Sequence, residues 1–304
     1  MKIRSILLIS ATVLLCAGPA SANAISHTWV SGTGSDSNPC TFALPCATFQ
    51  MAANNTASGG MISVAGPGDF GPVTVNHAMT IDGSNVGSIT FSGEFGIYVN
   101  LTSAAPVILR NLTVDGLGQG WQGITFRGPG NLIIDNCRIE GVTAGCIEVE
   151  SNAAQNVVVR NTVIQGGDVG FSVSSGAGPV QASLQNVTIE GTAAQSADYG
   201  TAAVETLSGN TQITNSVLTQ NAIAVNALTG STMSVESSML TSNTTAVCAE
   251  AGAKIRLEND DILDNGTGVA ACGGQIKTSG NNGDSGNTNG NPGIPSEVSP
   301  TVVF

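Results

Sequence analysis

Charged and aromatic residues are scarce in this sequence: 10 % of the 304 residues are charged and 4 % are aromatic. Gly, Ser, Thr, Asn, Val and Ala dominate instead, a composition that is unlike a helical enzyme and typical of short strands joined by many turns. Basic residues are especially few, nine against 21 acidic ones, which gives a formal net charge of -12. This charge excludes an electrostatic surface for nucleic acid or for an anionic membrane, and it repels uronic-acid polymers unless a cation mediates the contact.

Long apolar runs are also missing, since no segment is continuously apolar for the roughly 18 residues that a membrane-spanning helix needs. The run over residues 6–17 follows two basic residues and precedes a small-residue segment, which is the pattern of a secretory signal peptide. We therefore predict a signal peptide over residues 1–24, cleaved near Ala22 or Ala24, and a soluble protein that is secreted or periplasmic. Cleavage leaves seven of the nine basic residues against 21 acidic ones, a net charge of about -14.

One phrase recurs through the middle of the chain: apolar, any, apolar, any, Asn, any two residues, aliphatic, then a turn rich in Gly or Asn. The pivot of the phrase is its Asn position, and the intervals between successive pivots along the chain are 25, 25, 25, 29, 22 and 22. The longest interval predicts an inserted loop at residues 193–199. The pivots are Asn111, Asn136, Asn161, Asn186, Asn215, Ser237 and Asn259.

The positions two before and three after each pivot are aliphatic in every copy, and a third apolar pair follows most of the turns. Alternation with a period of two marks short strands with one buried face, and a near-constant repeat stacks equivalent positions on one another. Three short strands in each coil predict a three-sided parallel solenoid. Asparagine suits the pivot because it tolerates the left-handed backbone region that a bend between strands needs.

This pattern resembles the right-handed parallel β-helix of the pectin-lyase-like superfamily, whose members often carry an asparagine ladder at such a bend. Residues 47–53 are similar to the segment in which a short helix caps the first coil of that superfamily. We predict an all-β chain: a single-stranded right-handed parallel β-helix over residues 59–280, an N-terminal cap with a short helix over residues 25–58, and a C-terminal loop and tail over residues 281–304. The superfamily is functionally diverse, so the fold alone implies little about activity.

Six cysteines remain after the predicted cleavage, and an even number in an exported chain favours disulfides over metal sites or catalytic thiols. The six are Cys40, Cys46, Cys137, Cys146, Cys248 and Cys272. The first two close a short Pro-containing loop and are the clearest pair. The last two are separated by slightly more than the local repeat, so a disulfide between adjacent coils is feasible. The middle two fall within one coil and would close its turn if they were bonded.

The enzymes of the superfamily imply residue sets that are not matched in this sequence. Its lyases combine a basic side chain with calcium held by several Asp, and no basic residue lies in a segment similar to a lyase motif. Its polygalacturonases combine Asp pairs with Gly-His-Gly and Arg-Ile-Lys segments, whereas His27 and His77 both precede the main repeats. Asp260 and Asp261 resemble such a pair superficially, and they are our catalytic candidates.

Asp260 occupies a column whose other members are apolar or small: Leu112, Cys137, Thr162, Val187, Ser216 and Ser238. A carboxylate there is either partly buried, with a raised pKa and catalytic potential, or close to the open C-terminal end, where burial is incomplete. We favour incomplete burial.

Two outward columns carry charges. The residue before the pivot reads Arg110, Asp135, Arg160 and Gln185, which predicts a ladder of salt bridges between coils. The fourth residue after the pivot reads Asp115, Glu140, Gln165 and Glu190. Like charges on adjacent coils are unfavourable unless they are solvated, paired or bridged by a cation, so calcium at Asp115 and Glu140 is one interpretation. We favour a solvated acidic face, with Arg138 as the nearest basic partner.

Sugar-binding grooves usually offer aromatic faces, and few are present. Trp121, in a Gly-rich turn, and Tyr199, in the predicted insertion, are the candidate platforms, although we favour packing of each over its own loop. The sequence as a whole favours a non-catalytic exported β-helix without a cofactor, a scaffold for surface, adhesion or carbohydrate contact with a polysaccharide or cell-surface glycan. The alternative is a polysaccharide-processing lyase or hydrolase with calcium or acid and base groups on an outward face.

Overall fold

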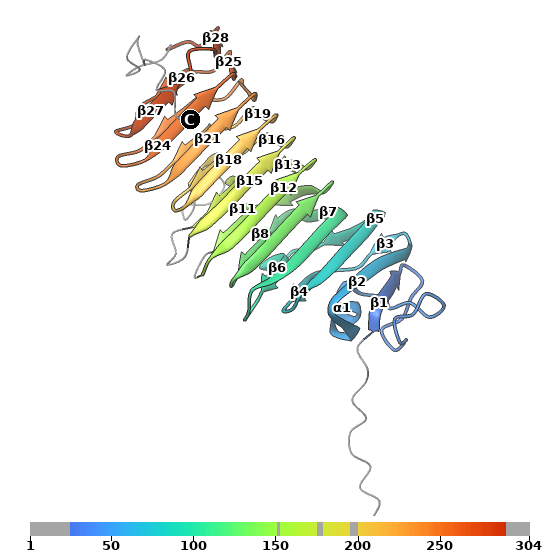
Figure 1. Cartoon of the computed structure of the whole chain (residues 1–304). Coiled ribbons are helices and arrows are strands. Elements are labelled where there is room, and N and C mark those ends of the chain that lie inside the picture. The colour runs from blue at the N-terminus through green and yellow to red at the C-terminus, as the bar shows by residue number, and fades with distance from the viewer. Residues whose placement is uncertain (1–24, 151–152, 175–178, 195–199, 290–304) are drawn as a thin grey trace, which may run out of the picture.

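A computed structural model describes residues 25–150, 153–174, 179–194 and 200–289. The predicted signal peptide lies outside the described residues. Successive strands stack along one axis from β1 (Ile25–Ser31) to β28 (Gly283–Ser285), as Figure 1 shows. The strands of adjacent coils pair in parallel, for example β12 (Gln155–Arg160) with β15 (Val180–Gln185). The predicted right-handed parallel β-helix is confirmed.

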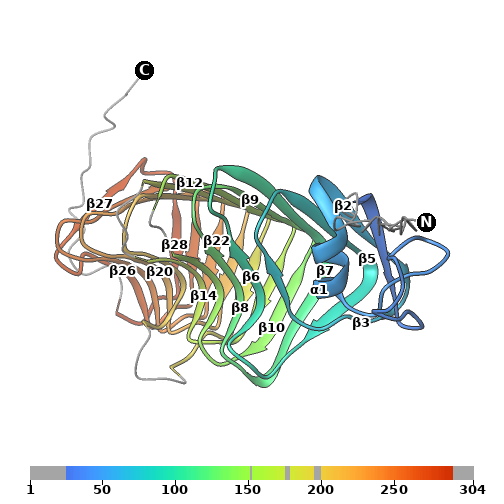
Figure 2. The same ribbon diagram turned by 90° about the horizontal axis from the view of Figure 1, so that it is seen from below.

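One side of each coil belongs to a nine-stranded parallel sheet. Its strands are β4 (Val73–Val75), β6 (Phe95–Asn100), β8 (Gln122–Arg127), β11 (Gly145–Glu150), β14 (Val169–Val173), β17 (Ala202–Thr206), β20 (Ile223–Ala227), β23 (Thr245–Ala249) and β26 (Thr267–Ala270). Of these, β6, β8, β14, β20 and β26 are labelled in Figure 2. We call this sheet the nine-stranded sheet. The remaining strands form a 19-stranded sheet that bends around the other two sides.

The pivot bend divides this larger sheet. The pre-pivot side holds β1, β2 (Thr56–Gly66), β5 (Met79–Thr90), β7 (Ala105–Gly120), β9 (Gly130–Asp135), β12, β15, β18 (Asn210–Thr214), β21 (Thr232–Glu236), β24 (Lys254–Glu258) and β27 (Gln275–Thr278). The post-pivot side holds β3 (Gly68–Asp69), the ends of β5 and β7, β10 (Arg138–Val142), β13 (Val163–Gln165), β16 (Thr188–Glu190), β19 (Val217–Thr219), β22 (Met239–Thr241), β25 (Asp261–Leu263) and β28. β28 continues the coil pattern a few residues beyond residue 280.

The core follows the two aliphatic columns predicted from the repeat, since every member is at most 2 % exposed. They are Leu109, Ile134, Val159, Leu184, Ile213, Val235 and Leu257 before the pivot, and Val114, Ile139, Ile164, Ile189, Leu218, Leu240 and Ile262 after it. All seven pivots adopt the left-handed region, with φ between 51° and 57°. The predicted side-chain ladder is formed in part: Asn136 Nδ2 donates to Asn111 Oδ1 at 2.8 Å and Asn186 Nδ2 to Asn161 Oδ1 at 2.9 Å.

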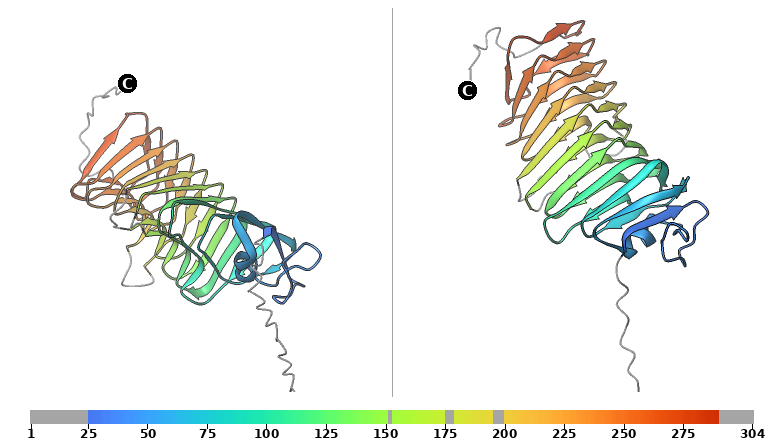
Figure 3. Two further views of the ribbon diagram at one scale, coloured as in Figure 1. Left: turned by 60° about the horizontal axis from the view of Figure 1, so that its bottom comes forward. Right: turned by 45° about the vertical axis from the view of Figure 1, so that its right-hand side comes forward.

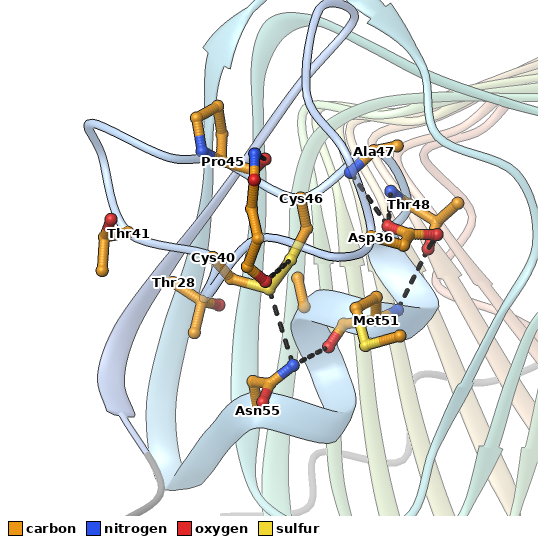
Figure 4. The surroundings of a disulfide bond; sticks show 12 residues. Thr28, Asp36, Cys40, Thr41, Pro45, Cys46, Ala47, Thr48, Met51 and Asn55 are labelled. Atoms are coloured by element: carbon orange, nitrogen blue, oxygen red, sulfur yellow. Dashed lines mark hydrogen bonds between the residues drawn. A yellow bond between two sulfur atoms is a disulfide. The ribbon is translucent and has the colours of Figure 1, made fainter.

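The N-terminal end of the core is covered by the predicted short helix, α1 (Phe49–Asn55), which lies against β1 and β2 at the blue end in Figure 3. Thr48 caps it, because its hydroxyl accepts from the Met51 N–H at 3.1 Å. The Asp36 carboxylate in turn accepts from the Ala47 and Thr48 N–H groups at 2.9 and 3.0 Å (Figure 4). These contacts tie the loop before the helix to its first turn.

Two of the three predicted disulfides are present. Cys40–Cys46 closes the loop beside α1, with 4.6 Å between the Cα atoms (Figure 4), and Cys248–Cys272 joins the last coils, with 5.6 Å between the Cα atoms. The third candidate pair, Cys137 and Cys146, is wrong, since both are free, buried thiols.

Their environments explain this correction. Cys137 follows the pivot bend and points at the carbonyls of Leu109 and Asp135, whereas Cys146 belongs to the nine-stranded sheet and points at the carbonyl of Gly166. Burial raises the pKa of Cys137 to about 12 and raises that of Cys146 as well, so both thiols stay protonated. In the part of the chain that the structure describes, no helix is long and apolar enough to cross a membrane.

Candidate functional site

A groove of about 390 Å³ crosses the pre-pivot side over β12, β15, β18 and β21, which lie next to one another in Figure 1. Strand alternation points every second side chain outward, and these are almost all amides and hydroxyls. The outward residues are Asn156, Val158, Gln181, Ser183, Asn210, Gln212, Thr232 and Ser234. None of the residues that line the groove is charged.

The amides of the groove are partly organised by one another. Asn156 Nδ2 donates to Asn131 Oδ1 of the preceding coil at 2.9 Å, and Asn210 Nδ2 donates to Gln181 Oε1 at 3.3 Å. Each amide still has donor and acceptor capacity that faces solvent, because a carboxamide offers two N–H groups and two lone pairs. We call these residues the amide groove. It can bind a ligand rich in hydroxyl groups, and it offers nothing specific to an ion.

A second candidate lies on the outer face of the nine-stranded sheet. Strand register stacks one outward position through successive coils: Thr74, Tyr98, Thr125, Glu148, Ser172, Glu205, Asn226 and Cys248. Outward positions are usually solvated, yet Glu148 is 3 % exposed, Ser172 4 % and Glu205 7 %. We call this row the outer column. It places two carboxyl groups in a covered environment two coils apart, about 10 Å between strand positions.

Burial in the outer column raises the pKa of both carboxyl groups. Burial raises the pKa of Glu148 to about 8, the charges of Glu150 and Glu205 act in the same direction, and a hydrogen bond with Ser172 opposes them. Burial also raises the pKa of Glu205, against a hydrogen bond from Asn226 Nδ2 at 3.2 Å. Glu148 Oε1 has no hydrogen-bond partner within the described ranges. Glu148 is therefore a neutral carboxylic acid at pH 7, a form that can donate a proton.

Two glycines make room for these carboxyl groups. A Cβ at Gly145 would overlap the Glu148 carboxylate, and a Cβ at Gly200 would overlap that of Glu205. Each carboxyl group therefore lies directly against backbone that has no side chain. Any substitution at Gly145 or Gly200 would displace the neighbouring carboxyl group.

Asp260 is buried, at 1 % exposure, so our expectation of incomplete burial near the C-terminal end is wrong. Its carboxylate accepts from two backbone N–H groups, those of Ser238 at 2.9 Å and Glu258 at 3.0 Å, while its own N–H donates to Asn282 at 2.8 Å. Ser238 and Ser216 make the equivalent contacts one and two coils earlier. Asp260 thus belongs to an intercoil backbone ladder, and burial raises its pKa to about 6.

Asp261 does not join Asp260 in a pair. The two residues are consecutive, so their side chains point to opposite faces, and Asp261 is exposed on β25 between Met239 and Gly283. The superficial likeness to a catalytic Asp pair is therefore not supported by the geometry.

The predicted charge ladder before the pivot is formed in part, since Arg160 pairs with Asp135 as expected whereas Arg110 pairs with Asp82 of the preceding coil. Arg110 pairs with Asp82 at 2.8 Å and Arg160 pairs with Asp135 at 2.9 Å, each across adjacent coils. Burial acts to raise the pKa of both aspartates, but hydrogen bonds from Asn111 to Asp82 and from Arg160 to Asp135 help to bring each pKa below its usual value.

The acidic column after the pivot has the partner that the sequence suggested. Glu140 pairs with Arg138 at 2.6 Å, and Arg138 also donates to Gln165 at 2.6 Å. Asp115, next to Glu140 in register, accepts from the Leu117 N–H at 2.8 Å. Among the described residues, no group of three or more His, Cys, Asp or Glu side chains is arranged to hold a metal ion.

Of the two aromatic candidates, Trp121 is half-buried in the turn before β8, where its carbonyl accepts from the Ala144 N–H at 3.0 Å. Tyr199 lies outside the described residues. Sequence reasoning missed Phe95 and Tyr98, whose rings stack at 4.6 Å between centroids on β6. It also missed Glu148, between Ile147 and Val149, and Glu205, between Val204 and Thr206, because alternation alone assigns these positions to solvent.

Comparison with known proteins gives one match. A family model described as "Right handed beta helix region" matches residues 73–240, more than half of the chain, from β4 to β22. No curated protein and no solved structure matches the sequence.

Proposed function

Because the chain belongs to the right-handed β-helix family, we propose that it is an exported, non-catalytic scaffold that binds an uncharged glycan in the amide groove. One observation carries this proposal: four adjacent coils present a shallow groove lined by outward amides and hydroxyls, with no charged lining residue. Two disulfides and the signal-like N-terminal sequence support an oxidising, extracytoplasmic location.

The ligand class follows from hydrogen-bonding capacity and charge. Sugar hydroxyls both donate and accept, as do the carboxamides of Asn156, Gln181 and Gln212. The net charge of -12 disfavours uronic acids and sulfated chains unless cations screen them. The three intervals of about 4.8 Å between the four strands span roughly 15 Å, so the groove is long enough for more than one sugar unit.

Isothermal titration of the mature protein with neutral oligosaccharides and with oligogalacturonate tests the proposal. Gln181→Ala with Gln212→Ala removes two amides from the groove, and we expect binding of the neutral glycan to weaken by about 30-fold, since each net hydrogen bond is worth about 1 kcal/mol. Gln165→Ala, an outward amide on the post-pivot side of the same coils, is the matched control and should bind as the wild type does. A preference for oligogalacturonate, or equal affinity of the three proteins, would reject the amide groove as the site.

A second candidate function, hydrolysis of a glycosidic bond, is favoured by the raised pKa of Glu148 and its position two coils from Glu205. Glycosidases use one protonated and one ionised carboxyl group about 5 to 10 Å apart. It ranks second because both groups are covered. Release of reducing ends from neutral or acidic glycans, abolished in both Glu148→Gln and Glu205→Gln, would place this function first.

A further inference from the structure

The outer face of the nine-stranded sheet is open at its N-terminal end. Thr74 on β4 is exposed and Tyr98 on β6 is half-exposed, whereas Thr125 on β8 and the carboxyl groups beyond it are buried. A hollow of about 250 Å³ occupies this open end, lined by Gln50, Pro72, Val73, Thr74, Phe95 and Tyr98. Gln50 comes from α1, so the cap helix forms one wall and the first two strands of the sheet form the floor.

The floor of the hollow is aromatic. The rings of Phe95 and Tyr98 stack with 4.6 Å between their centroids and 15° between their planes, and both side chains are partly exposed. They are two of only ten Phe and Tyr residues in the sequence. The Arg127 guanidinium lies over the Tyr98 ring, 5.6 Å from its centroid, so the partly exposed Phe95 ring offers the apolar surface that suits a ligand with one apolar face.

The polar groups around the rings are held in place. Arg127 Nη1 donates to the Tyr98 hydroxyl at 2.9 Å, and the same guanidinium is ion-paired with Glu150. The Tyr98 oxygen acts as acceptor in that bond, so its own O–H remains available to donate. On the opposite wall, Gln50 Oε1 accepts from the Thr74 N–H at 2.8 Å, which fixes the Gln50 side chain.

The charge at the hollow is balanced. The positive charge of Arg127 is paired with the carboxylate of Glu150, and none of the six lining residues is ionised. An anionic or cationic ligand therefore gains no net attraction there. An uncharged ring with one apolar face and a rim of hydroxyl groups matches the floor and the Tyr98 and Thr74 hydroxyls together.

We propose that this hollow is a second carbohydrate site, one that stacks a single uncharged pyranose ring on Phe95 and hydrogen-bonds it through Tyr98. It rests on the proposed function only for the class of ligand, since it lies on a different side and on earlier coils than the amide groove. A long glycan that reached both sites would bind more tightly than either site alone allows, because the second contact becomes intramolecular.

The inference is tested by titrating the mature protein with a neutral monosaccharide glycoside and with neutral tetrasaccharides. Saturation-transfer NMR and calorimetry detect the binding. Phe95→Ala should weaken binding of the monosaccharide glycoside at least tenfold, and Tyr98→Phe, which keeps the ring and removes the hydroxyl, should weaken it about threefold to fivefold. Thermal unfolding of each variant checks that the coils remain folded. Gln185→Ala, remote from the hollow, should bind as the wild type does.

The outcomes separate the two sites. Loss of monosaccharide binding in Phe95→Ala, with unchanged binding in Gln181→Ala plus Gln212→Ala, supports the hollow and rejects the amide groove for this ligand. The reverse result overturns the hollow and leaves the amide groove in place. Unchanged affinity in Phe95→Ala, no binding of any neutral sugar at millimolar concentration, or preferential binding of a proline-rich peptide would each overturn the inference.

Discussion

The coils of the N-terminal half are longer than those of the C-terminal half, and the two halves turn their corners by different means. The separation between stacked asparagines is 25 from Asn111 to Asn136 in the first half and 22 from Asn221 to Asn243 in the second. We call them the long-coil half and the short-coil half. After the post-pivot strands, the long coils turn at glycines with positive φ, such as Gly141.

The short coils make the same turn without glycine. They turn at Gln220, Ser242 and Asp264, also with positive φ, and each of the three is followed by a buried asparagine. The shorter corner has fewer backbone groups to satisfy its own hydrogen bonds, so a side-chain amide takes that role.

These asparagines form a second ladder inside the short-coil half. Asn221 N–H donates to Asn243 Oδ1 at 3.0 Å, and Asn243 N–H donates to Asn265 Oδ1 at 2.9 Å. The Nδ2 group of Asn243 donates to the Leu218 carbonyl, also at 3.0 Å. Ion pairs show the opposite distribution: of the five in the described ranges, four belong to residues 82–160 and one to Arg256 and Glu258. Since partly exposed pairs contribute little, buried amides should matter more to stability than surface charges.

The largest expected effect is a pH dependence that originates in the long-coil half. Burial raises the pKa of Glu148 from 4.5 to about 8, so the folded state binds a proton that the unfolded state has released. The contribution of this proton to the free energy of unfolding is fully present below about pH 4.5 and is lost as the pH rises through 8. The change is roughly 3 to 5 kcal/mol at most. Urea denaturation at pH 5, 7 and 9 should show this decline in the wild type and a clearly shallower decline in Glu148→Gln, in which the raised pKa values of Glu205 and Asp260 remain. An unchanged decline in the variant would assign the dependence elsewhere.

The next effect belongs to the short-coil half. Asn243→Ala removes the acceptor of the buried Asn221 N–H and a donor to the Leu218 carbonyl, which should cost about 3 kcal/mol of unfolding free energy. Thr241→Ala, two residues away and partly exposed, should change it by less than about 0.5 kcal/mol. The midpoint of urea denaturation measures both. Equal midpoints would show that the corner does not depend on its amide ladder.

A smaller effect separates the two consecutive aspartates of the same half. Asp260→Ala removes the acceptor for two backbone N–H groups and should lower the free energy of unfolding by about 2 kcal/mol. Asp261→Ala should leave the free energy of unfolding nearly unchanged. The pKa of Asp260 is raised from 3.8 to about 6, so its protonated form stabilises the fold below pH 3.8 and this contribution fades as the pH rises through 6. Thermal unfolding measured between pH 3 and 7 tests this dependence of stability on pH. A shared effect of both variants on stability would contradict the structural role assigned to Asp260 alone.

The smallest effect concerns the ion pairs that distinguish the long-coil half. Arg160→Ala breaks its pair with Asp135, whose partners are partly exposed, and should cost less than about 1 kcal/mol. The loss should shrink further in added salt, because surface pairs are screened. Urea denaturation at low and high ionic strength measures it. A larger, salt-independent loss would mean that charges, rather than buried amides, dominate this half.

Much of the fold was accessible from the sequence because it depends on local repetition. The pivots, both aliphatic columns, α1 and the Cys40–Cys46 loop all follow from spacing and residue type within one or two coils. One pair of the predicted salt-bridge ladder followed as well, since stacking by one repeat places Arg160 beside Asp135. The amide groove was not identified, because single outward amides are ordinary until four coils align them.

The parallel β-helix itself was determined by the sequence, since aliphatic side chains that alternate within strands and recur at a near-constant interval between coils bury their faces in only one way. The tertiary structure alone decided which outward positions lose contact with water. It buried Glu148 and Glu205 on the outer face, turned Asp260 into a ladder acceptor and kept Cys137 apart from Cys146. Burial of an outward residue depends on what covers it and on which corner it occupies, and neither is encoded in the alternation of a single strand.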